Sequence, residues 1–111
     1  MIKSVSFWSF PGGMTVWEIL RAAKSIGFEA VELTVEASGE ITLDTSADDL
    51  MRLRDMADEM GMRLPTVATG LHWQFPLVGP DPDACAKGIA ITKKTLEAAK
   101  VFGAQTVLAV P

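Results

Sequence analysis

The sequence predicts an α/β protein in which parallel strands and helices alternate as βαβαβαβ. Three helical segments each end at a glycine, and a strand begins shortly after every one of these residues, Gly27, Gly61 and Gly103. The recurrence indicates consecutive βα units, whose crossover connections are right-handed. No linker or low-complexity segment interrupts the pattern, which predicts a single domain or part of one.

The second strand, which follows Gly27 and runs to about Glu36, is the most informative stretch. Side chains alternate between the faces of a strand, which here separates apolar from polar residues: Val31, Leu33 and Val35 against Glu32, Thr34 and Glu36. The flanking helices predict a parallel strand that is covered on both faces. A carboxylate such as Glu32 therefore needs a cation or a hydrogen-bond donor, because burying it alone costs several kcal/mol.

The first βα unit begins with a strand over Ile2–Trp8, followed by a loop over Ser9–Met14. Proline and two glycines mark this loop. Thr15 and Glu18 form a capping-box pattern at the start of the first helix, and Gly27 is suited to end that helix.

The later units follow the same pattern. Ser46 is expected to cap the second helix, which Gly61 ends, and the third strand occupies Arg63–Thr69. A long loop precedes Asp81 and Pro82, a combination typical of the N-cap and first residue of a helix. This third helix runs to about Phe102, and the fourth strand covers Thr106–Val110.

Composition narrows the classes of function. The chain has 111 residues, 49% of them hydrophobic and 22% charged, as in ordinary globular proteins. A net charge of −4 with scattered Lys and Arg argues against a nucleic-acid partner. No apolar run reaches the roughly 20 residues of a membrane span, so no membrane partner is expected. The single cysteine, Cys85, and an N-terminus without a signal-peptide pattern predict a cytoplasmic protein.

Several segments together resemble a known superfamily. They are Gly27–Leu33 (GFEAVEL), Leu64–Val67 (LPTV), Gly70–Leu77 (GLHWQFPL), Leu96–Ala104 (LEAAKVFGA) and Thr106–Pro111 (TVLAVP). In this order they resemble xylose isomerase-like TIM barrels, which include sugar-phosphate isomerases and epimerases and endonuclease IV-type enzymes. The branch of L-ribulose-5-phosphate 3-epimerase and D-tagatose 3-epimerase is the most similar.

The resemblance implies a (β/α)8 barrel of roughly 250 residues, of which residues 1–111 form the N-terminal half. It also implies a sugar or sugar-phosphate isomerase or epimerase that moves a proton next to a carbonyl through an enediolate. The family holds a divalent metal, Mn, Mg or Co, through Glu, Asp, His and Glu on later strands. None of these ligands matches a position here, so no metal ligand or catalytic residue is assigned. The chain by itself is expected to be inactive.

Candidate substrate-binding residues lie at the carboxyl ends of the predicted strands, where barrels of this kind place their sites. They are Phe7, Trp8, Glu32, Thr69, His72 and Phe75. The aromatic rings of the first strand either stack on the C–H face of a sugar or cap the interior. Glu32 either orients substrate or belongs to a structural polar network. The only histidine lies in an aromatic loop that is a candidate lid, whereas Glu36 is expected to be solvated.

Other classes of function remain as alternatives. An endonuclease IV-like phosphodiesterase needs several histidines and a basic groove, whereas this chain has one histidine and a negative charge. A dinucleotide-binding module needs G-x-G-x-x-G, which Gly12 and Gly13 do not provide, and a receiver needs an acid where Thr69 stands. The last alternative is a non-catalytic half-barrel that assembles with itself. The expected partners are a small sugar or sugar phosphate, together with a second copy or a missing C-terminal half.

Overall fold

Four parallel strands pair in the order of the chain, β1-β2-β3-β4, in the computed structural model, which describes residues 1–111. The strands are β1 Ser4–Ser6, β2 Ala30–Val35, β3 Thr66–Thr69 and β4 Thr106–Val107. The helices between them are α1 Val16–Ile26, α2 Ala47–Glu59 and α3 Pro82–Phe102. Short 3-10 turns, η1 Phe7–Ser9 and η2 Leu71–Trp73, follow β1 and β3. The order confirms the predicted α/β half-barrel and excludes a doubly wound sheet, in which the strands are reordered.

Each helix begins at the residue that the sequence indicates. The side chains of Thr15, Ser46 and Asp81 accept hydrogen bonds from backbone N–H groups of the first turns of α1, α2 and α3. Gly27 and Gly103 end α1 and α3 in the left-handed conformation, with φ of 107° and 71°. Glycine adopts this conformation without the steric cost that a Cβ brings, so the chain can leave each helix directly towards the next strand.

Strand register divides the sheet into an apolar and a polar face. Val5 pairs with Val31, and Leu33 pairs with Val67, so the apolar face continues across strands. The other face carries mainly small and polar residues: Ser4, Ser6, Ala30, Glu32, Thr34, Thr66, Ala68 and Thr106. The helices contribute to the core on the apolar face, so the polar face is the side that points to the interior of a barrel.

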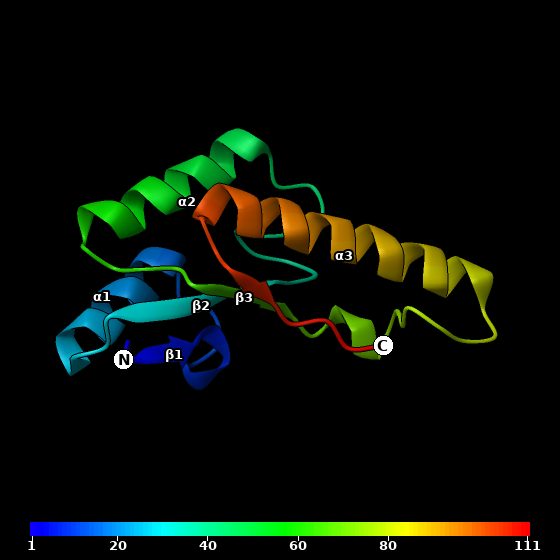
Figure 1. Ribbon diagram of the computed structural model, residues 1–111, viewed down its shortest axis with the longest axis horizontal. Coiled ribbons are helices and arrows are strands. Elements are labelled where there is room, and N and C mark those ends of the chain that lie inside the picture. Colours follow the sequence, from blue (N-terminus) through cyan, green and yellow to red (C-terminus); the bar gives the residue numbers. More distant parts are fainter.

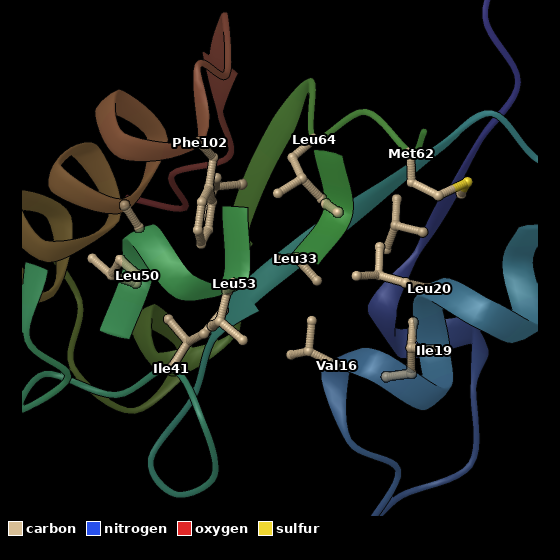
Figure 2. Packing of buried hydrophobic residues seen from close by; sticks show 14 of the residues in the cluster. Val16, Ile19, Leu20, Leu33, Ile41, Leu50, Leu53, Met62, Leu64 and Phe102 are labelled. Atoms are coloured by element: carbon tan, nitrogen blue, oxygen red, sulfur yellow. The ribbon is translucent and has the colours of Figure 1, made fainter. Parts of the chain in front are cut away.

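The hydrophobic core lies between this apolar face and the three helices. Figure 2 shows side chains of α1 and α2, among them Val16, Leu20 and Leu53, converging around Leu33 of β2. Leu33 and Leu20 are fully buried. In Figure 1, α2 and α3 run side by side over the sheet, and the chain end after β4 lies next to η2. The core therefore fixes the strands whose carboxyl ends carry the site.

The strands are shorter than the sequence predicts. The first strand ends at Ser6, because the Ser6 hydroxyl accepts a hydrogen bond from Trp8 N and turns the chain into η1. The third begins at Thr66 rather than Arg63, because Pro65 has no N–H to donate to the ladder. The fourth ends at Val107, although Leu108 N still donates to Val67 O at 2.9 Å. None of the helices is both long enough and apolar enough to cross a membrane.

Gly88 allows α3 to lie directly against the loop that follows β3. A Cβ at this position would lie 2.5 Å from Phe75 O and 2.7 Å from Pro76 O, well inside van der Waals contact. Both atoms belong to backbone, which cannot turn away as a side chain can. Because Gly88 has no side chain, the loop that carries His72 and Phe75 can pack directly against α3.

We predict that Gly88→Ala destabilises the protein by about 1–3 kcal/mol through overpacking, although alanine favours a helix by about 1 kcal/mol. Urea unfolding followed by circular dichroism measures the change. Gly12→Ala is the matched control, because a Cβ at Gly12 meets no atom within 4 Å. Equal stability of the Gly88 variant and the wild type would show that the helix and the loop are not in this close contact.

Candidate functional site

A pocket of about 440 Å³ lies at the carboxyl ends of β1 and β2. The residues that follow these two strands form most of its wall: Phe7, Gly13, Met14, Thr15, Val16, Thr34, Glu36, Ala37, Ser38, Gly39, Glu40 and Ile41. Carboxyl ends of barrel strands are where enzymes of this architecture bind their substrates. The pocket is therefore the candidate functional site.

Trp8 contacts residues at the carboxyl ends of two strands, and one of them, Glu36, belongs to the pocket wall. Its indole Nε1 donates a hydrogen bond of 2.9 Å to Glu36 Oε1, just after β2. Its ring also lies against Gly70, where a Cβ would be 3.5 Å from Trp8 Cζ2. Trp8 remains 49% exposed, so part of the ring is free to contact a ligand. Phe7 is half-buried, lines the pocket and packs against the core.

Glu36 is held in place at this site and is only partly exposed, contrary to the expectation that it is solvated. Its backbone N–H donates to Ile41 O at 2.9 Å, which folds the following loop back over the end of β2. The signal in the sequence was the alternation of β2, which places Glu36 on the same face as Glu32. What the sequence could not show was that Trp8 turns back to donate to its carboxylate.

The loop after β2, residues 36–41, also caps α1. Glu40 Oε2 accepts a hydrogen bond of 2.6 Å from Val16 N, and Thr15 Oγ1 accepts one of 3.1 Å from Glu18 N. Two N–H groups at the start of α1 are thus satisfied by side chains. The contact from Glu40 joins the loops after β1 and β2 into one wall of the pocket.

Glu32 lies deeper in the sheet than the pocket. Its Oε2 accepts a hydrogen bond of 2.7 Å from the Thr66 hydroxyl on the neighbouring strand. The bond supplies the donor that a carboxylate in this position needs, and it ties β2 to β3 across the polar face. Glu32 does not line the pocket.

Thr69 is buried at the end of β3, and its hydroxyl forms hydrogen bonds with backbone groups. Thr69 Oγ1 donates to Val35 O at 2.9 Å and accepts from Leu71 N at 3.1 Å. These contacts join the ends of β2 and β3 and start the turn η2.

His72 is 2% exposed and lies between α3 and the chain that leaves β4. Val110 N donates to its Nδ1 at 3.3 Å, which assigns the ring proton to Nε2. Nε2 then donates to Thr92 Oγ1 at 3.0 Å, with Gly88 O at 3.3 Å. Both ring nitrogens are therefore engaged within the protein.

Phe75 lines a smaller cavity of about 180 Å³, which shares Glu36 and Ala37 with the pocket after β1 and β2. The Lys87 ammonium lies 4.2 Å from the centre of the Phe75 ring, a cation–π contact between the loop and α3. The structure thus places Phe7 in the wall of the pocket after β1 and β2, Trp8 beside it through the hydrogen bond to Glu36, and Phe75 at the smaller cavity. Glu32, Thr69 and His72 form hydrogen bonds within the scaffold, and their substrate contacts stay predictions.

The fold and site define an α/β protein of the TIM-barrel class, seen here as four parallel strands with a pocket at their carboxyl ends. A family model described as xylose isomerase-like TIM barrel matches residues 20–111. The chain belongs to this family.

Curated relatives of the chain carry the names of sugar-phosphate epimerases. An L-ribulose-5-phosphate 3-epimerase from Shigella flexneri serotype 5b is 33% identical over 101 residues, which are 89% of this chain and 36% of the relative. An Escherichia coli protein of the same name is 32% identical over the same shares. The chain therefore spans little more than a third of the length of these relatives.

Solved structures show the same fold. A D-psicose 3-epimerase crystallised in the presence of D-fructose aligns with a TM-score of 0.75 and 18% identity, over 96% of this chain and 36% of that one. The apo form of a 3-keto-D-glucoside 4-epimerase from E. coli aligns with a TM-score of 0.64 and 16% identity, over 98% and 38%. At these identities the likeness concerns the fold alone.

We predict that His72→Phe destabilises the protein by about 1–3 kcal/mol, because Val110 N–H and Thr92 lose their buried partner. Urea unfolding measures the loss, and amide hydrogen exchange of Val110 reports the contact itself. Gln74→Ala, an exposed change in the same loop, is the control. Unchanged stability together with unchanged Val110 exchange would contradict the assigned contacts.

Proposed function

We propose that this chain forms part of a sugar or sugar-phosphate isomerase or epimerase. The reaction moves a proton next to a carbonyl group through an enediolate. The observation that carries the proposal is the identity of 33% to an L-ribulose-5-phosphate 3-epimerase over 89% of this chain. The pocket at the carboxyl ends of β1 and β2 supports it, because a substrate of a barrel enzyme is bound at that end.

In this proposal the chain supplies a wall of the substrate site. Phe7 in the pocket wall and the exposed ring of Trp8 beside it offer aromatic surface to the C–H face of a sugar, and Phe75 contributes from the loop after β3. The hydrogen bond from Trp8 to Glu36 fixes the ring before substrate arrives, which lowers the entropic cost of binding. Hydrogen bonds hold the neighbouring strands and loops together next to this wall; they are formed by Glu32, Thr69 and His72.

A divalent metal, Mn, Mg or Co, is part of the proposed function, but the side chains of residues 1–111 do not fit it. No group of three or more His, Cys, Asp or Glu side chains comes together in a metal-binding arrangement. His72, the only imidazole, uses both ring nitrogens in contacts with protein atoms. We therefore place the ligands outside this chain and derive no step through a metal.

Further strands are proposed as partners of this sheet. In residues 1–111 β1 pairs only with β2, and β4 pairs only with β3, so each outer strand has an edge of free backbone groups. Either the C-terminal part of a longer barrel or a second copy of the chain would pair with them. The cytoplasmic location predicted from the sequence belongs to the same proposal.

Purified as residues 1–111, the chain is predicted to self-associate, because a second copy supplies four more strands and eight close a barrel. Sedimentation equilibrium over a concentration series measures the molar mass. A stable monomer at high micromolar concentration, with slowly exchanging β4 amides, would contradict pairing through these edges.

The function itself is tested with the complete gene product. We predict that it epimerises at least one ketopentose, ketohexose or their phosphates, and that exchange of a substrate C–H proton with solvent accompanies turnover. Residues 1–111 alone are predicted to give no turnover, with or without added manganese. A gene product that is folded yet inactive on this panel, but cleaves DNA at abasic sites, would favour the endonuclease alternative.

A further inference from the structure

The pocket beside β2 contains a polar group that the protein itself does not use. Thr34 Oγ1 is the one buried side-chain oxygen or nitrogen without a hydrogen-bond partner, and Thr34 is 2% exposed. Leaving a buried hydroxyl unpaired costs about 1–3 kcal/mol, which valine at this position would avoid. Thr34 also lines the pocket, so a ligand bound there lies beside this side chain.

Glu36 provides a second hydrogen-bonding group two residues further along the same face of β2. Its Oε1 is engaged by the Trp8 indole at 2.9 Å, which leaves Oε2 without a protein donor. A carboxylate accepts strong hydrogen bonds from hydroxyl groups, and a hydroxyl such as that of Thr34 both donates and accepts. The two side chains together suit a ligand with neighbouring hydroxyl groups.

The same pocket is unsuited to a phosphate group. Its charged lining residues are Glu36 and Glu40, both acidic. A helix N-terminus would otherwise attract an anion, and α1 begins at this wall. There, however, Val16 N already donates to Glu40 at 2.6 Å and Glu18 N donates to Thr15 at 3.1 Å. The N-terminus is capped by the protein, and one of its caps is itself an anion.

We propose that Thr34 and Glu36 bind the uncharged, hydroxylated part of the substrate, and that any phosphate lies outside this pocket. The proposal rests on the sugar epimerase function proposed above. It assigns specificity to two residues of the β2 segment and orients a phosphorylated sugar with its phosphate away from α1. A volume of about 440 Å³ lies within the range of small-molecule sites.

The test uses ribitol, an alditol that lacks the carbonyl group and cannot be epimerised. It is titrated into the isotope-labelled 111-residue chain while NMR follows the Thr34 amide and the Trp8 indole N–H. The expected result is a saturable shift of both signals, with Trp17 and Trp73 as internal references. Thr34→Val and Glu36→Gln are each expected to weaken binding about tenfold, the loss of one good hydrogen bond.

Thr106→Val is the matched control, because Thr106 lies on the same face of the sheet in β4 and outside the pocket. It is expected to bind ribitol as the wild type does. Inorganic phosphate, titrated in the same way, is expected to leave both signals unchanged. Thr34→Ser and Thr34→Ala form a second comparison should the valine variant not fold, since both lose the methyl group and only serine keeps the hydroxyl.

Absence of a saturable ribitol shift, or unchanged ribitol affinity in folded Thr34→Val, would overturn the proposal. Phosphate that competes with ribitol would also overturn it. These outcomes are separate from failure of the proposed function, because ribitol binding needs no chemistry. An inactive gene product with an intact ribitol site would reject the epimerase, whereas an active one without the site would reject only the role of Thr34 and Glu36.

Discussion

The alternation of apolar and polar side chains along β2 determines both the core and the position of the candidate site. It directs Val31, Leu33 and Val35 into the core beneath the helices, and all three are fully buried. The intervening positions, Glu32, Thr34 and Glu36, face the opposite side. A shift of register by one residue would exchange these faces, placing carboxylates among α1 and α2. The pairing of β2 with both neighbours therefore sets the core and the candidate site together.

The loop after β2, residues 36–41, forms one wall of the pocket next to the polar face of the strand. Ile41 anchors the loop in the core, and Glu40 reaches the first N–H of α1. On the other side, the Lys94 ammonium of α3 donates to Thr45 O, in the segment that leads to α2. The connection between β2 and α2 is thus tied to both α1 and α3. Such ties hold the pocket in shape before a ligand binds.

The helices were predictable because local chemistry determines their ends. Thr15, Ser46 and Asp81 cap them, and Gly27 and Gly103 close two of them, as the sequence alone indicates. Strand ends were less predictable, since the end of β1 depends on one hydrogen bond from Trp8 N to the Ser6 hydroxyl. The strand order and the family followed from the resemblance and were confirmed.

The candidate site was predictable only in part. Phe7 and Trp8 were chosen because they end the predicted first strand; Phe7 lines the pocket and Trp8 contacts its wall through Glu36, while their role in binding stays a prediction. His72 was chosen for its chemistry, yet its ring is enclosed by contacts to Thr92 and Val110, which are 20 and 38 residues away. The proposed binding roles of Thr34 and Glu36 depend on tertiary contacts: no protein group pairs with the Thr34 hydroxyl, and Trp8 donates to one oxygen of Glu36. Composition and spacing carry no information on such tertiary contacts.

Trp8 lies across the ends of β2 and β3, where it contacts Glu36 and Gly70, and this placement is what makes it a candidate part of the proposed substrate site. A nuclear Overhauser spectrum of the labelled chain tests this placement. Cross-peaks are expected between the Trp8 ring proton on Cζ2 and the α protons of Gly70, because a Cβ at Gly70 would lie 3.5 Å from Trp8 Cζ2. Absence of these cross-peaks, while those between paired Leu33 and Val67 are present, would contradict the position of the Trp8 ring across the strand ends.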